Sequence, residues 1–142
     1  MYKNILVSID LNHESSWTKA LPVAASMAKS MGASLHAVTV VPDFGMSIVG
    51  NYFPKDFEKQ ALVDAAEKLK SFVASHVDKS VPVKVHVGHG TIYEEIIHVA
   101  DKTNCDLIVV GSHRPELQDY LLGPNAARVV RHAKQSVLVV RD

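Results

Sequence analysis

Residues 105–141 read CDLIVVGSHRPELQDYLLGPNAARVVRHAKQSVLVVR, and their hydrophobic pattern alternates between strand and helix. Asp106 to Val110 is a near-continuous apolar run that ends at Gly111, which is typical of a buried strand. A polar loop follows, then a helix from Asn125 to Ala133 and a last apolar strand from Ser136 to Val140. Two buried strands joined through a helix indicate a parallel pair, because parallel neighbours need a crossover connection.

The same alternation extends back to the N-terminus. Apolar runs predict strands at Asn4 to Ile9, Ser34 to Val41 and Val83 to Val87; helical spacing predicts helices from Trp17 to Gly32, from Phe57 to Val73 and from Thr91 to about Asn104. We expect Pro22 to kink the first helix, and Thr91 with Glu94 to form a capping box on the third. Five strands and four helices predict a doubly wound α/β fold, Rossmann-like, with a five-stranded parallel sheet and helices on both faces. No linker divides the chain, so residues 1–142 are expected to form one domain.

Composition excludes several kinds of partner. The 142 residues carry 15 Lys+Arg and 15 Asp+Glu, so no broad basic field attracts nucleic acid or anionic lipid. No apolar stretch approaches the ~18 residues that cross a bilayer, and the N-terminus does not resemble a signal peptide. The single cysteine, Cys105, precedes a buried strand and is expected to be a packing residue. We therefore predict a cytoplasmic protein without nucleic-acid or membrane partners.

The C-terminal ends of the strands are where an open α/β sheet binds ligands. Asp10 follows the first strand, and Gly111, Ser112, His113 and Arg114 follow the fourth. Gly111 permits close backbone approach, the Ser112 hydroxyl and the His113 and Arg114 side chains suit phosphate oxygens, and a carboxylate such as Asp10 suits amines or hydroxyls.

A second glycine turn, Gly123-Pro124-Asn125, opens the next helix, whose N-terminal amides favour an anion. The two turns therefore bracket a candidate phosphate pocket. The alternative is structural: Gly111 only ends a strand, Gly123 and Pro124 only start a helix, and Arg114 lies in water.

Several of these segments resemble one known family. Residues 105–141, with SHRP at 112–115 and YLLGPNA at 120–126, closely resemble the C-terminal half of universal stress proteins, particularly the F/G-type bacterial members. KNILVSID at 3–10 resembles the family's first strand, and the Ala-rich first helix and GTIYEEI at 90–96 extend the resemblance over nearly the whole chain. It implies binding of ATP, with or without Mg²⁺, for which we identify no protein ligand.

The resemblance also implies roles for individual residues. Nucleotide-binding members carry glycine, two residues, glycine, nine residues, glycine and then Ser or Thr around the phosphates. Gly111 and Gly123 match the first and third glycines, whereas Arg114 replaces the second glycine and Pro124 replaces the hydroxyl residue, without an N–H. Asp10 is expected beside adenine and ribose, Val40 at the adenine edge and Gly90 on the ribose side. The full predicted set is Ser8, Ile9, Asp10, Val40, Gly90, Gly111, Ser112, His113, Arg114, Gly123, Pro124 and Asn125.

Catalytic and metal functions find little support in the sequence. There is no GxSxG, GxxxxGK[ST] or DxD motif, so no catalytic residue is assigned and ATP hydrolysis is expected to be slow at most. His86 and His89 are three apart in a strand and face opposite sides, and His36 is expected to be a packing histidine, so no metal site is assigned.

Two functions therefore remain open. One is an ATP-binding stress-response regulator. The other is a nucleotide-independent protein that works through its dimer or partner-binding surface. The strand Ser136 to Val140 is apolar on both faces, and as the final strand it is expected at a sheet edge. The family resemblance implies that it pairs with the same strand of a second chain in a homodimer.

Overall fold

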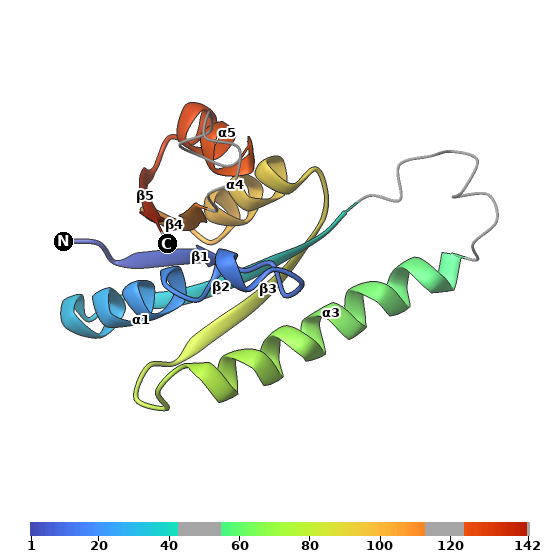
Figure 1. The fold of residues 1–142 in the computed structure, drawn as a ribbon, viewed down its shortest axis with the longest axis horizontal. Helices are drawn as coiled ribbons and strands as arrows, with labels where there is room; N and C mark the ends of the chain where they lie inside the picture. Colours follow the sequence, from blue (N-terminus) through green and yellow to red (C-terminus); the bar gives the residue numbers. More distant parts are fainter. Residues whose placement is uncertain (43–54, 113–123, 142) are drawn as a thin grey trace.

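A parallel five-stranded sheet forms the centre of the molecule (Figure 1). The structure, a computed structural model, describes residues 1–42, 55–112 and 124–141. Its elements are β1 (Asn4–Ser8), the 3-10 helix η1 (Glu14–Ser16), α1 (Ala20–Met31), β2 (Ser34–Pro42), α3 (Lys55–His76), β3 (Val83–Gly90), α4 (Ile92–Lys102), β4 (Leu107–Ser112), α5 (Pro124–His132) and β5 (Ser136–Arg141). The strand order is β3-β2-β1-β4-β5, with every neighbouring pair parallel. This confirms the predicted doubly wound α/β fold.

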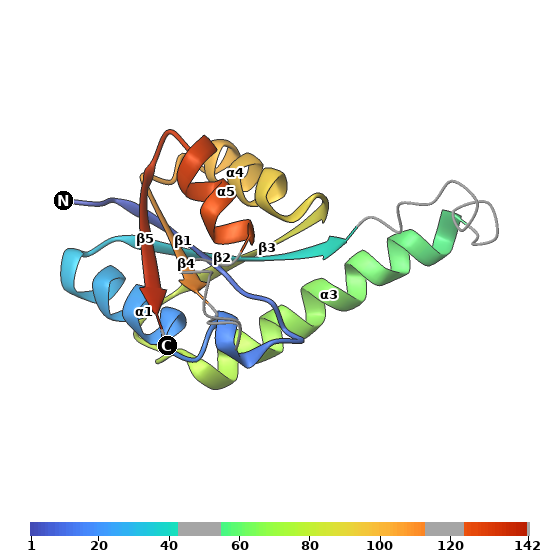
Figure 2. The same ribbon diagram turned by 45° about the horizontal axis from the view of Figure 1, so that its top comes forward.

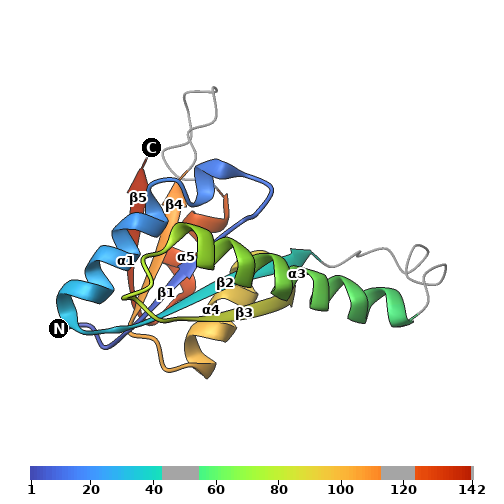
Figure 3. The same cartoon turned by 90° about the horizontal axis from the view of Figure 1, so that it is seen from below.

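Helices cover both faces of the sheet. Helices α1 and α3 lie on one face, and α4 and α5 lie on the other (Figures 2 and 3). Side chains alternate accordingly along β1: Ile5 and Val7 pack in the core beneath α1 and α3, whereas Leu6 packs beneath α4 and α5. A strand that is buried on both faces has to be apolar at consecutive positions, which explains the unbroken hydrophobic runs in the sequence.

Two local expectations need correction at the helix starts. Helix α1 begins at Ala20 and not at Trp17, so Pro22 lies in its first turn, where a backbone N–H has no intrahelical partner. Pro22 therefore belongs to the start of the helix and does not interrupt it. The capping box at Thr91 is wrong: Thr91 is the N-cap residue of α4 but makes no side-chain capping bond. A neighbouring carboxylate, Glu95, accepts instead from the His89 N–H at 3.1 Å.

Asp106, the residue before β4, links the start of β4 to the start of β1 through hydrogen bonds. The Asp106 carboxylate accepts from the backbone N–H groups of Lys3 at 3.0 Å and Asn4 at 3.0 Å. Burial pushes the pKa of Asp106 upward, but these backbone hydrogen bonds outweigh it and hold the pKa below its ordinary value.

Cys105 is buried with its sulfur 3.1 Å from the Thr103 hydroxyl, and burial raises the pKa of its thiol. The buried, protonated thiol agrees with a packing role.

Candidate functional site

A pocket of about 150 Å³ opens at the C-terminal edge of the sheet, where β1 and β4 lie side by side. From β1 the chain passes to β2 on one side, and β4 leads to β5 on the other, so the strand order reverses at this point. A crevice forms at such a switch point because the connections on its two sides leave in opposite directions. The pocket is lined by Ser8, Ile9, Asp10, Ser16, Val40, Ile92, Ile96, Val110, Gly111, Asn125 and Ala126.

Half of the predicted site residues lie together around this pocket. They are Ser8, Ile9, Asp10, Val40, Gly111 and Asn125, and they come from four separate segments of the chain. Gly90, Ser112 and Pro124 are not among the lining residues, and Ser112 is only 1% exposed. His113, Arg114 and Gly123 lie outside the described residues. Contact of these twelve residues with a ligand stays a prediction.

Four apolar residues that line the pocket were not among the site residues predicted from the sequence. Ile92 and Ile96 lie one turn apart on α4, and Val110 and Ala126 come from β4 and α5. Their spacing fits ordinary core positions, and Ile96, Val110 and Ala126 do belong to the core beneath α4 and α5. These residues differ from other core residues because they lie at the end of the core that faces the pocket. Only the packed arrangement reveals that.

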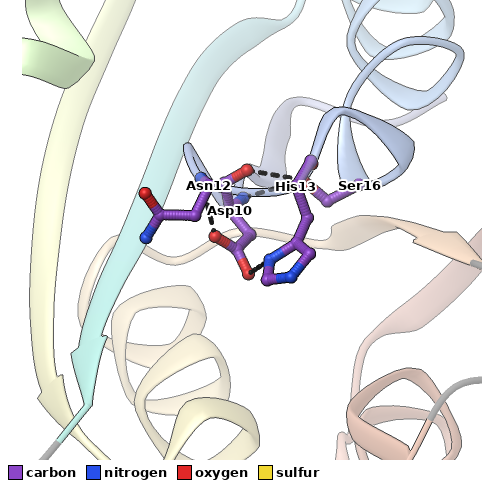
Figure 4. A network of polar contacts seen from close by, with 4 residues as sticks. All are labelled: Asp10, Asn12, His13 and Ser16. Atoms are coloured by element: carbon purple, nitrogen blue, oxygen red, sulfur yellow. Dashed lines mark hydrogen bonds and ion pairs between the residues drawn. The ribbon is translucent and has the colours of Figure 1, made fainter.

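Asp10, which lines the pocket, is held by a network of hydrogen bonds (Figure 4). Asp10 Oδ1 accepts from the Asn12 N–H at 3.0 Å, and Asp10 Oδ2 lies 2.8 Å from His13 Nδ1. The Ser16 hydroxyl accepts from the Asp10 N–H at 2.9 Å and donates to the His13 carbonyl at 2.8 Å. Residues 10–16 thus satisfy one another's polar groups and present the Asp10 carboxylate, about half exposed, to the pocket.

This loop also explains the glycine at position 111. A Cβ on Gly111 would stand 2.5 Å from the Ser16 carbonyl oxygen and 3.0 Å from that of Ser15. The backbone of η1 therefore packs directly on β4 at the one point where β4 has no side chain. Gly111 lines the pocket and also allows the loop that carries Asp10 to pack against β4, so this close approach by itself accounts for a glycine at this position.

The end of β3 is organised by α3 and α4. His89 Nδ1 lies 3.0 Å from Glu58 Oε1 on α3, and the His89 N–H bonds to Glu95 on α4. Gly90 has a φ of +134°, which an L side chain rarely adopts, so backbone geometry by itself accounts for a glycine here.

The chemistry of the pocket is mixed. Among the described residues that line the pocket, Asp10 is the one that carries a charge, and Ser8, Ser16 and Asn125 add uncharged polar groups. The remaining wall is apolar, which suits a flat, largely uncharged ring, while the carboxylate suits a hydrogen-bond donor and repels a phosphate. Of the described residues, no group of three or more His, Cys, Asp or Glu is arranged to hold a metal ion. None of the described helices has the length and hydropathy to cross a bilayer.

A β3-β2-β1-β4-β5 parallel sheet with a pocket at its switch point defines a doubly wound α/β protein of the kind that holds a small ligand at the C-terminal edge. The model of the universal stress protein family matches residues 1–141. The chain belongs to that family, which confirms the resemblance seen in its sequence.

Individual relatives align over nearly the full length. Universal stress protein G of Escherichia coli O157:H7 is 33% identical over 144 residues, which cover 99% of this chain and 100% of the relative. The structure of the universal stress protein UspA from Lactobacillus plantarum is 26% identical with a TM-score of 0.74, over 99% of this chain and 98% of that one. A universal stress protein solved in complex with cAMP is 25% identical with a TM-score of 0.63, over 99% and 97% of the two chains.

Proposed function

We propose that the protein binds an adenine nucleotide, ATP, at the pocket between β1 and β4 and acts as a small cytoplasmic stress-response regulator. The observation that carries this proposal is the pairing, in one pocket, of the Asp10 carboxylate with an apolar wall. The complex of a related universal stress protein with cAMP, itself an adenine nucleotide, supports the choice of base.

The pocket divides the nucleotide into two parts. Adenine would lie against the apolar side chains of Val40, Ile92 and Ile96, and a ribose hydroxyl would donate to Asp10. Because Asp10 repels phosphate oxygens, the phosphates would extend toward Asn125 at the start of α5, where helix amides favour an anion. The predicted phosphate residues His113, Arg114 and Gly123 precede that helix in the chain.

Replacement of Asp10 with asparagine should weaken adenosine binding about tenfold or more, because a hydrogen bond to a charged group is worth about 1.5–3 kcal/mol. ATP should lose affinity by a smaller factor, since replacement of the carboxylate also removes its repulsion of the phosphates. Titration calorimetry of both ligands measures the two factors. Asp64→Asn, an exposed carboxylate on α3 that contacts Gln60, is the matched control and should leave both affinities unchanged.

Failure of adenosine and ATP to bind the wild-type protein at millimolar concentration would refute nucleotide binding. Equal affinities of wild type and Asp10→Asn would refute the assigned role of Asp10. Absorbance at 260 nm of the freshly purified, denatured protein provides an independent check for copurified nucleotide.

The second candidate, a nucleotide-independent function through a dimer surface, is favoured by the edge position of β5. Val137 to Val140 are only partly buried, although each packs against the core on one face of the sheet. An apolar edge strand with open backbone groups favours pairing with another strand. We therefore infer a homodimer in which β5 pairs with β5 of a second copy.

Sedimentation velocity at micromolar concentration should show a species of twice the chain mass of 15.5 kDa. A monomer would exclude this surface.

A further inference from the structure

His13 is the side chain that binds the second oxygen of the Asp10 carboxylate. Asp10 Oδ1 accepts from the Asn12 N–H at 3.0 Å, whereas Asp10 Oδ2 lies 2.8 Å from His13 Nδ1 (Figure 4). A second hydrogen bond between the same residues, from the His13 N–H to the Asp10 carbonyl at 3.1 Å, keeps the imidazole close to the Asp10 carboxylate. His13 itself is 72% exposed, so burial does not account for its position.

The geometry dictates the direction of the bond. An ionised carboxylate only accepts hydrogen bonds, so Nδ1 of His13 has to carry the proton that it donates to Asp10. The terminal torsion of an aspartate is broad, and one partner on Oδ1 leaves the plane of the carboxylate loosely defined. A second partner on Oδ2 fixes that plane.

The contact with His13 leaves acceptor positions on the Asp10 carboxylate for a ligand. The two oxygens of Asp10 together have about four acceptor positions, of which the described contacts occupy two. Both contacts come from residues of the same loop, so the remaining positions are available to a donor in the pocket that Asp10 lines. An oriented carboxylate binds such a donor better than a rotating one, because less conformational entropy is lost on binding.

We propose that His13 is a positioning residue for ligand binding: it orients the Asp10 carboxylate toward a hydroxyl donor of the bound ligand, which is the ribose of the adenine nucleotide. The inference rests on the proposed function, because it assumes that Asp10 meets the ligand. It adds a residue outside the predicted set, and it makes binding through the ribose hydroxyls depend on a side chain that does not line the pocket.

The test compares two replacements of His13 in the full chain. His13→Ala removes the donor, whereas His13→Asn retains a side-chain N–H close to the position of Nδ1. Titration calorimetry is run with adenosine and with 2′,3′-dideoxyadenosine, which lacks the 2′- and 3′-hydroxyls of the ribose. His13→Ala should weaken adenosine binding by about two- to fivefold, as expected for an exposed hydrogen bond to a carboxylate, and His13→Asn should restore most of that loss. Neither replacement should change the affinity for dideoxyadenosine.

Glu14→Gln is the matched control, since Glu14 is an exposed neighbour in the same loop, and its affinities should equal those of the wild type. A wild-type protein that binds neither adenosine nor ATP would refute the proposed function itself. A wild type that binds adenosine as tightly as His13→Ala does would overturn the role of His13 and leave the proposed function intact. The role of His13 would also be overturned if His13→Ala weakened adenosine and dideoxyadenosine equally and His13→Asn restored neither affinity. That pattern would indicate a general change in the structure of the loop.

Discussion

Replacement of Gly111 with alanine is expected to lower the free energy of unfolding by about 2–4 kcal/mol, at the upper end of the range for added atoms in a packed interior. The added Cβ would stand 2.5 Å from the Ser16 carbonyl oxygen and 3.0 Å from the carbonyl carbon of the same residue. These are backbone atoms, which cannot rotate away as the end of a side chain can. Either β4 or the loop of residues 10–16 has to move. Urea unfolding at pH 7 measures the loss.

Gly32→Ala is the contrasting control for this prediction. Gly32 ends α1 with a φ of +64°, and a Cβ built there meets no atom within 4 Å. Its replacement therefore adds backbone strain of about 1–2 kcal/mol without a clash, whereas Gly111→Ala adds a clash. If Gly111→Ala lowers stability no more than Gly32→Ala does, the close approach of η1 to β4 is not a rigid feature of the fold.

The arrangement of strands and helices was accessible from the sequence because it depends on local patterns. Apolar runs such as Leu107 to Val110 are buried on both faces, and helix ends coincide with residues such as Gly32. The end of the first strand followed from the same patterns to within one residue, which is why Asp10 could be placed at the sheet edge before the sheet order was known. Val40 was expected in the site only because of the family resemblance. Pro22 and Thr91 show the limit of this reasoning. A helix start three residues later than expected changes the role of the proline, and Thr91 occupies the expected cap position without making the capping bond.

Contacts between distant segments were not accessible in this way. Ser16 enters the pocket because η1 folds back on Gly111, and nothing in the spacing of 95 residues between them predicts that contact. The pairing of His36 with His86 was missed for the same reason. The sequence does predict that His86 and His89 face opposite sides, and their partners agree: His86 contacts His36, and His89 contacts Glu58 of α3. The partners themselves depend on the β2–β3 register, in which Val38 lies opposite His86.

The pair of histidines forms a hydrogen bond inside the protein. His36 Nδ1 lies 2.9 Å from His86 Nε2, the rings stack with centroids 5.1 Å apart, and His36 is 5% exposed. One ring nitrogen has to donate and the other has to accept, so the bond survives with both rings neutral or with one additional proton. Two additional protons leave no acceptor and place two cations in contact. Burial lowers the pKa of both histidines, and the nearby positive charges of Lys84 and, for His86, Lys102 lower it further.

We therefore expect the protein to lose stability as the pH falls below the ordinary histidine pKa of 6.5. Below that pH the unfolded chain binds protons at both histidines, whereas the folded chain resists them, so each proton of difference lowers the free energy of unfolding by about 1.4 kcal/mol per pH unit. Above pH 6.5 the contribution is fully present. Between pH 7.5 and pH 5 the upper limit of this loss is about 4 kcal/mol, the value for a folded pair that takes up neither proton. Urea unfolding at half-unit pH intervals measures this slope.

Variants of single histidines separate this pair from the other titrating groups. His86→Gln keeps a polar side chain beside His36 but cannot take up a proton, so the slope between pH 7.5 and pH 5 should become shallower than in the wild type. His98→Gln removes an exposed histidine from α4, the helix that also carries Lys102, and should leave the slope unchanged. Because most carboxylates titrate below this window, they contribute little to the comparison. A His86→Gln slope as steep as that of the wild type would mean that the acid sensitivity arises elsewhere and that the buried pair tolerates protonation in the folded state.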